Sequence, residues 1–110
     1  IQVTIFRDSE ESGDVLRELS FQGMQLRGER TGYRLRGVSA LVLNMANSVE
    51  AFTEDGFEGE MDEQTGGFSF HFTAEISPES QLLMNSLVLG LRNIEKEYGE
   101  RHIIIRFEEV

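Results

Sequence analysis

A chain of 110 residues has the length of one ordinary domain, so we expect a single domain over residues 1–110. With 39% hydrophobic and 27% charged residues, its composition excludes the disordered and collagen-like classes. Because cysteine is absent, disulfides, cysteine-bound metals and thiol nucleophiles are excluded, and two histidines are too few for a histidine-rich metal site. No apolar run approaches the roughly 20 residues that span a membrane, and the first residues lack the layout of a signal peptide. We therefore expect a cytoplasmic domain without membrane contact, metal or cofactor.

Acidic residues outnumber basic ones by 20 to 10, and the net charge of -10 argues against direct DNA binding by the body of the domain. Residues 24–36 are an exception, because four of the ten basic residues fall there and only Glu29 opposes them. The four are Arg27, Arg30, Arg34 and Arg36. The segment predicts either a cationic binding loop on an anionic body or a solvated loop whose arginines pair with nearby acids.

The first predicted strands form a hairpin. Residues 2–6 alternate between apolar and polar side chains, and residues 15–22 resume that alternation after the polar run at 8–14, which predicts a turn. From 23 to 37, glycines and the lack of any sustained apolar period predict a loop. Structureless segments of this length in so small a domain are usually functional or mobile, which directs attention to the arginines.

A helix is predicted over residues 38–52, because apolar residues recur there with helical spacing. A second hairpin follows, with strands at 57–61 and 67–73. On the second of these strands, Phe68, Phe70 and Phe72 alternate onto one face and predict its buried side. His71 then lies on the opposite face.

The second predicted helix has signals at both ends. Ser77 is a capping residue, Pro78 suits the first helical position, and the helix is expected to run to Tyr98 and stop at Gly99. Its apolar residues cover more than one face, which predicts either packing against a second copy of the chain or burial between the sheet and the first helix. A closing strand over 101–107 completes the order ββαββαβ. We expect a two-layer α+β fold, with one mixed sheet and two helices on one of its faces.

No self-sufficient catalytic group is evident from the residues. Ser39, at the predicted start of the first helix, either caps that helix or, with His71 brought near by folding, acts as the nucleophile of a hydrolase. Arg30 and Arg34, with Tyr33 between them, form a different candidate, because guanidinium groups grip phosphates and carboxylates and a tyrosine ring stacks on bases. This pattern predicts a small anion- or nucleotide-binding module.

Several short motifs occur in an order that matches a known family. They are Ile-Gln-Val at 1–3, Gly-Met-Gln at 23–25, Gly-Val-Ser-Ala-Leu at 37–41, Asn-Ser-Val-Glu at 47–50 and Gly-Gly-Phe at 66–68. With its second helix, the chain resembles the ribosomal-processing cysteine protease family, Prp, over nearly its whole length. Members of that family carry a Gly-His-Ala element and a Cys-Ala-x-Val-Ser run that enters a helix.

At the two catalytic positions that the resemblance implies, this chain departs from the family. Met24 stands in the place of the histidine. The place of the cysteine falls on Leu35 when positions are counted back from Ser39, and on Arg36 when they are counted forward from Gly23. None of these side chains forms a thiolate or abstracts a proton, so the resemblance implies a member without the family's chemistry. It also implies a homodimer and a role in removing the N-terminal extension of a large-subunit ribosomal protein.

The leading hypothesis is a non-catalytic, dimeric homologue that binds a ribosomal-protein segment or an anionic surface of the ribosomal particle through residues 24–36. The expected binding residues are Arg27, Arg30, Tyr33, Arg34, Arg36 and Ser39. Two alternatives stay open. One is an active peptidase that processes the ribosomal-protein extension, and the other is a small anion- or nucleotide-binding module.

Overall fold

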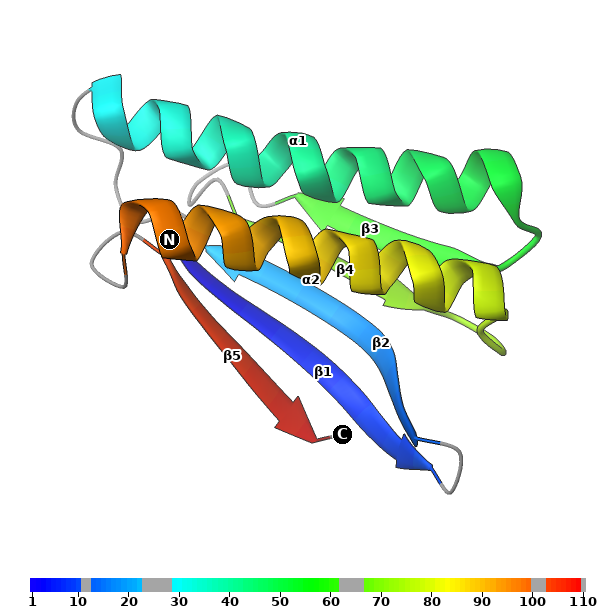
Figure 1. Ribbon diagram of the computed structural model, residues 1–110. Coiled ribbons are helices and arrows are strands. Elements are labelled where there is room, and N and C mark those ends of the chain that lie inside the picture. Colours follow the sequence, from blue (N-terminus) through cyan, green and yellow to red (C-terminus); the bar gives the residue numbers. More distant parts are fainter. Residues whose placement is uncertain (11–12, 23–28, 62–66, 100–102, 110) are drawn as a thin grey trace.

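The protein folds into one mixed five-stranded sheet with two helices on a single face, which confirms the predicted α+β architecture (Figure 1). This computed structural model describes residues 1–10, 13–22, 29–61, 67–99 and 103–109, and for 9–10, 13–14, 29–36 and 98 it describes the backbone alone. The strands are β1 (Gln2–Glu10), β2 (Gly13–Gln22), β3 (Phe57–Met61), β4 (Phe68–Phe72) and β5 (Ile104–Glu109). The helices are α1 (Glu29–Phe52) and α2 (Pro78–Tyr98), and the order ββαββαβ is the predicted one.

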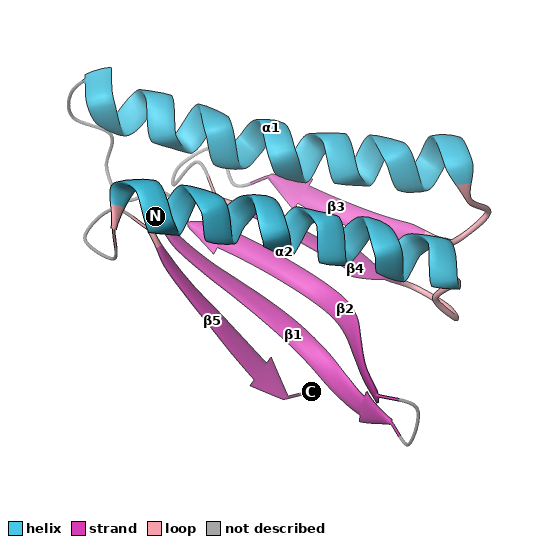
Figure 2. Cartoon of the chain, in the orientation of Figure 1, coloured by secondary structure: helices cyan, strands magenta, loops and turns pink. Residues whose placement is uncertain are grey.

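The strands lie in the order β3-β4-β2-β1-β5, so β3 and β5 form the two edges. The sheet is mixed because β1 pairs parallel with β5, whereas β1 with β2, β2 with β4 and β3 with β4 pair antiparallel. Helix α2 contacts β2 and β5. Helix α1 lies beside α2 and covers the part of the sheet that β4 and β3 form (Figure 2).

The turn predicted at residues 8–14 is wrong, because β1 and β2 continue through most of it. Their pairing runs as far as Glu10 and Gly13, and Arg17 bulges from β2 opposite the step from Phe6 to Arg7. Strand pairing is made by backbone hydrogen bonds and does not require apolar side chains. The polar residues therefore continue both strands in the part of the hairpin that extends beyond the helices (Figure 1).

The loop predicted over residues 23–37 is wrong in its second half, because α1 begins at Glu29 and not at residue 38. Glutamate, arginine and leucine in this part of the chain favour helix, while the glycines at 32 and 37 cost about 1 kcal/mol each. The apolar spacing that marks the buried face of α1 does not reach this end, so periodicity alone predicts the start too late. Residues 23–28 lie outside the described residues.

The core lies between the helix layer and one face of the sheet. It is formed by alternate strand residues and one stripe of each helix, among them Val3, Ile5, Leu19, Phe21, Phe70, Phe72, Val38, Val42, Met45, Val49, Met84, Leu87 and Leu91. The two helices approach closely at Gly90, where an added Cβ would lie 3.0 Å from Cδ1 of Leu41. Within the described residues, neither helix is long and apolar enough to cross a membrane.

Both ends of α2 confirm the sequence signals. The Ser77 hydroxyl accepts a hydrogen bond from the backbone N–H of Ser80 at 3.2 Å, and Pro78 is the first helical residue. Gly99 has a φ of 82°, a conformation that favours glycine, and its N–H donates to the carbonyl of Glu95 at 2.7 Å.

Gln81, in the first turn of α2, holds the helix to β2 beyond the end of β4. Its side-chain oxygen accepts from the N–H of Leu16 at 2.9 Å, and its side-chain amide donates to the carbonyl of Leu16 at 2.8 Å. Pairing between β2 and β4 ends at Glu18. The amide of Gln81 therefore satisfies backbone groups of β2 that no longer face β4.

Candidate functional site

The residues predicted to bind a partner, and the two that align with the family's catalytic pair, Met24 and Leu35, lie between the end of β2 and the first half of α1. Met24 and Arg27 are outside the described residues. Five others belong to α1: Arg30, Tyr33, Arg34, Leu35 and Arg36. Since an α-helix has about 3.6 residues per turn, Arg30 and Arg34 lie about one turn apart. These positions are thus part of a helix, where a loop was predicted.

Ser39 lies well inside α1 and is half-buried, so the predicted place at the helix start is wrong. The free backbone N–H groups of a helix belong to its first turn, which here begins at Glu29. Ser39 therefore neither caps the helix nor meets the field of its N-terminus.

His71 and Ser39 lie on opposite sides of the sheet. The neighbours of His71 in β4, Phe70 and Phe72, are buried under the helices, so His71 alternates to the other face. There its Nε2 lies 3.4 Å from Oε2 of Glu58. The sheet separates the imidazole from the hydroxyl of Ser39, and the serine–histidine hypothesis is wrong for this fold.

Asp55, which follows α1, is the centre of a hydroxyl cluster at the N-terminus of α2. Its Oδ2 accepts hydrogen bonds from the backbone N–H of Ser77 at 2.9 Å, from the hydroxyl of Ser77 at 2.6 Å and from the hydroxyl of Ser80. Ser80 is fully buried. The hydrogen bonds from the Ser77 and Ser80 side chains lower the pKa of the Asp55 carboxyl below its ordinary value, because they stabilise the ionised form.

The chemistry of this cluster is structural. A carboxylate with a lowered pKa is a poor general base, so the Ser80 hydroxyl beside it is not activated as a nucleophile. The cluster instead fixes the segment after α1 to the start of α2. The sequence marks Ser77 as a cap but carries no sign of the role of Asp55, because 22 positions separate the two and no local pattern joins them.

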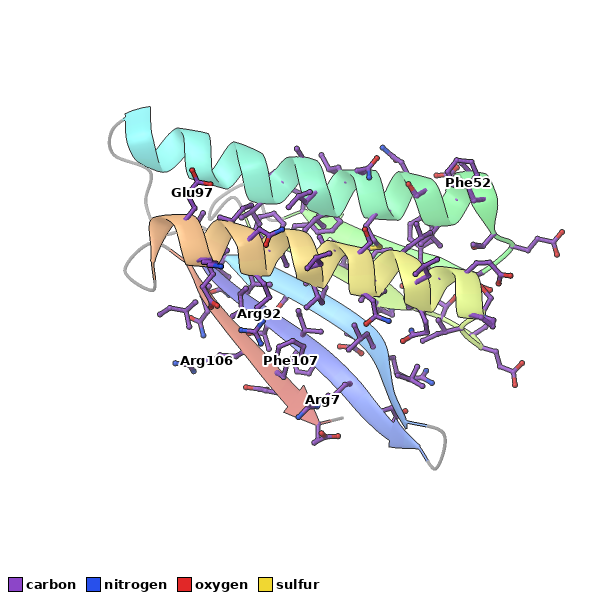
Figure 3. The ribbon with its side chains drawn as sticks, viewed as in Figure 1. Arg7, Phe52, Arg92, Glu97, Arg106 and Phe107 are labelled. Atoms are coloured by element: carbon purple, nitrogen blue, oxygen red, sulfur yellow. The ribbon has the colours of Figure 1, made fainter. Side chains whose placement is uncertain are left out.

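Two arginines stack on Phe107 near the β5 edge (Figure 3). The guanidinium carbon of Arg92 lies 5.1 Å from the ring centroid, and that of Arg7 lies 5.4 Å from it. Arg7 also pairs with Glu109 at 2.8 Å, and Arg92 with Glu95 at 3.3 Å. The cluster connects β1, β5 and α2. Because each guanidinium already has an acidic partner, the cluster is not an open anion site. Its members are too far apart in sequence to form a motif.

Comparison with known proteins identifies the scaffold. The family model of the cysteine protease Prp matches residues 36–103, which is more than half of the chain. The chain belongs to the Prp cysteine protease family. A search of curated proteins finds no match.

Solved structures share the whole Prp fold at low sequence identity. The essential ribosomal processing protease Prp from S. aureus, in complex with a substrate peptide, superimposes with a TM-score of 0.79 and 21% identity over 96% of this chain and 99% of that chain. SMU.848 from Streptococcus mutans gives a TM-score of 0.81 and 22% identity over 99% of this chain and 94% of that chain.

This member of the Prp family lacks the residue type for which the family is named. With no cysteine in the sequence, it forms no thiolate nucleophile. The match to Prp begins at residue 36, after Met24 and Leu35, the positions that the motifs align with the catalytic pair. In the described part of the chain, no three histidine or acidic residues are grouped to hold a metal ion. The Prp fold is present without the cysteine chemistry.

Proposed function

We propose that this Prp homologue is a non-catalytic binding protein, which holds a ribosomal-protein segment or an anionic surface of the ribosomal particle. The observation that carries the proposal is a Prp fold over nearly the whole chain combined with the absence of cysteine. The S. aureus Prp that shares the fold is a ribosomal processing protease with a bound substrate peptide. A homologue without the nucleophile keeps the scaffold for recognition and loses covalent catalysis. A cytoplasmic location, where ribosomal particles are found, is part of the proposal.

The proposed binding surface is the segment 24–36 with its four arginines. This segment carries a charge of +3, four basic residues against one acidic residue, in a chain whose net charge is -10. It includes the N-terminus of α1 at Glu29, and the field of a helix N-terminus also favours an anionic partner. The proposed contacts are Arg27, Arg30, Tyr33, Arg34 and Arg36, with Ser39 farther along the same helix.

We also propose a homodimer formed through the outer surface of the helix layer. The sequence has no charged residue over 37–49 or over 80–91, the central parts of the two helices. Leu82 and Leu89 are 70% and 64% exposed. They are seven residues, or about two helical turns, apart and therefore lie on the same side of α2. Leu82→Asp with Leu89→Asp is expected to shift the protein from dimer to monomer in sedimentation analysis. Ile104→Asp, which changes an exposed apolar residue of β5, serves as the control.

The test of binding uses a ribosomal-protein precursor that carries a cleavable N-terminal extension, together with ribosomal particles. We expect pull-down of one or both, weakened as salt rises, and an intact mass of the precursor that does not change. The double variant Arg30→Ala with Arg34→Ala should lose this binding. The matched double variant Lys96→Ala with Arg106→Ala removes the same charge from exposed positions on α2 and β5 and should retain it.

Three outcomes would contradict the proposal. Cleavage of the precursor would restore the active-peptidase alternative, for which the hydroxyls beside Asp55 offer only a carboxylate whose lowered pKa makes it a poor base. Failure to bind either the precursor or the particles would remove the proposed partner. A thermal shift with free nucleotides that the Arg30→Ala, Arg34→Ala variant abolishes, without ribosomal binding, would favour the anion- or nucleotide-binding module.

A further inference from the structure

The outer edge of β3 is open within the part of the chain that the structure describes, since no strand lies beyond it in the sheet. The carbonyl of Gly56 accepts a hydrogen bond from the N–H of Thr73 at 2.9 Å, one step before β3 begins. Hydrogen-bonded and non-hydrogen-bonded pairs alternate along an antiparallel ladder. Phe57, Gly59 and Met61 therefore direct their backbone N–H and C=O groups away from β4, toward the open edge. These are the groups that an added strand pairs with.

Exposed apolar side chains accompany this edge on the helix-facing side of the sheet. Met61 pairs with Phe68 of β4 and is 63% exposed. On α1, Leu41 packs against Gly90 of α2, and Leu43 lies two residues or about 200° farther around the helix, on the flank away from α2. Since α1 covers β4 and β3, this flank lies on the side of the β3 edge (Figure 1). Leu43 is 43% exposed, so a strand added to β3 would bring alternate side chains toward Leu43 and Met61.

The charge around β3 has one sign. Residues 37–91 contain nine acidic residues and no lysine or arginine, so all ten lysines and arginines lie in the rest of the chain. Glu58 and Glu60 are exposed on the outer face of β3, two residues apart, as alternate positions on a strand require. The other edge differs, because Arg7, Arg92 and Arg106 lie near β5 (Figure 3).

We infer that β3 binds an extended cationic peptide as a sixth strand of the sheet. The peptide's backbone pairs with Phe57, Gly59 and Met61, its apolar side chains contact Leu43 and Met61, and its lysine or arginine side chains face Glu58 and Glu60. The inference does not depend on the function proposed for residues 24–36, because that segment attracts the opposite charge and shares no residue with the proposed peptide site.

The test uses a fluorescent peptide of about ten residues, blocked at both ends, in which valine and lysine alternate, since this length pairs with all of a strand such as β3. We expect saturable binding by fluorescence anisotropy. A valine–glutamate peptide should not bind, and a valine–lysine peptide with N-methyl groups on alternate amides should bind at least about tenfold more weakly, because it cannot complete the ladder. Chemical shifts of the backbone amides of Phe57, Gly59 and Met61 should change most on binding.

Three variants locate the site. Met61→Pro removes an outward N–H and leaves the ladder to β4 intact, and it should weaken binding about tenfold. Glu60→Lys should weaken peptide binding about fivefold at low salt. Glu108→Lys makes the same change at an exposed glutamate of the edge strand β5 and should alter peptide binding less than about twofold. If Met61→Pro fails to fold, the amide chemical shift changes that the peptide causes in the unaltered protein still locate the site.

Four results would overturn the inference. They are equal binding of the valine–glutamate peptide, equal binding of the N-methylated peptide, chemical shift changes centred on β5, and equal effects of the two glutamate substitutions. If β3 instead pairs with β3 of a second copy, Met61→Pro will abolish self-association in sedimentation analysis, and the occupant is then not a cationic peptide.

Discussion

Removal of the Asp55 carboxylate should destabilise the fold more than any other single change to an acidic residue in the described part of the chain. Asp55 accepts two hydrogen bonds from Ser77 and one from Ser80. In Asp55→Ala the hydroxyl of Ser80, which is fully buried, loses its charged acceptor and keeps only the Thr53 hydroxyl at 3.5 Å, at a cost of about 1–3 kcal/mol. Loss of the bonds that Ser77 donates to a charged group adds about 1 kcal/mol or more. We therefore expect the free energy of unfolding to fall by about 3 kcal/mol.

The measurement is urea unfolding followed by circular dichroism at neutral pH. Glu54→Ala removes an exposed carboxylate one residue away and should change the free energy of unfolding by less than about 0.5 kcal/mol. Asp55→Ala combined with Ser80→Ala also removes the buried hydroxyl that has lost its charged acceptor, so the double variant should be more stable than the sum of the two single effects predicts. A loss below about 1 kcal/mol in Asp55→Ala, or simple additivity with Ser80→Ala, would refute the argument.

The same cluster predicts a pH dependence. The folded state lowers the pKa of Asp55 below its ordinary value of 3.8, so the folded protein holds this proton less tightly than the unfolded chain does. The contribution of the carboxylate to stability is therefore complete above about pH 3.8 and is lost as the pH falls through the lower folded-state value. The difference in unfolding free energy between the unaltered protein and Asp55→Asn should shrink on acidification across that range. A difference that grows on acidification would contradict the direction of the shift.

Three further substitutions, with Phe52→Ala as a control, test packing, hydrogen bonding and backbone conformation by urea unfolding. Phe70→Ala should cost about 3–5 kcal/mol, because this side chain is 1% exposed, whereas Phe52→Ala, at 77% exposure, should cost less than about 0.5 kcal/mol. Gln81→Leu leaves the N–H and carbonyl of Leu16 without their side-chain partner and should lower the free energy of unfolding by about 2 kcal/mol. An unchanged stability would show that water replaces the amide. Gly99→Ala should cost about 1 kcal/mol, since its φ of 82° strains any residue with a Cβ, and a stabilised variant would refute this.

The parts of the fold that could be predicted from the sequence are those with local causes. Helix α2 is bounded by Ser77, Pro78 and Gly99, which act on their own neighbours, and the structure confirms all three. The phenylalanine alternation in β4 is likewise a property of five consecutive residues. The start of α1 at Glu29 could not be predicted in this way. The residues there favour helix by their intrinsic propensity, but no apolar stripe marks a buried face.

The candidate site was less predictable, because its geometry depends on distant parts of the chain. Sequence reasoning could join Ser39 to His71 only by assuming a favourable fold, and the sheet separates them. It could not find the contact of Asp55 with Ser80, 25 positions apart, or the stack of Arg7 and Arg92 on Phe107. The open edge of β3 also depends on strand order, which no local pattern specifies.

The parallel pairing of β1 with β5 has a consequence for how the domain folds. These neighbours in the sheet are about a hundred residues apart in the chain, and the ion pair of Arg7 with Glu109 spans 102 positions. Contacts of such high sequence separation slow folding, because the entropy of closing a long loop is lost before the contact forms. During synthesis the polypeptide emerges β1 first, and that strand has only β2 beside it until β5 has been translated. The domain should therefore reach its final stability only after β5 has emerged from the ribosome, and a truncation before residue 103 should leave β1 as an exposed edge prone to aggregation.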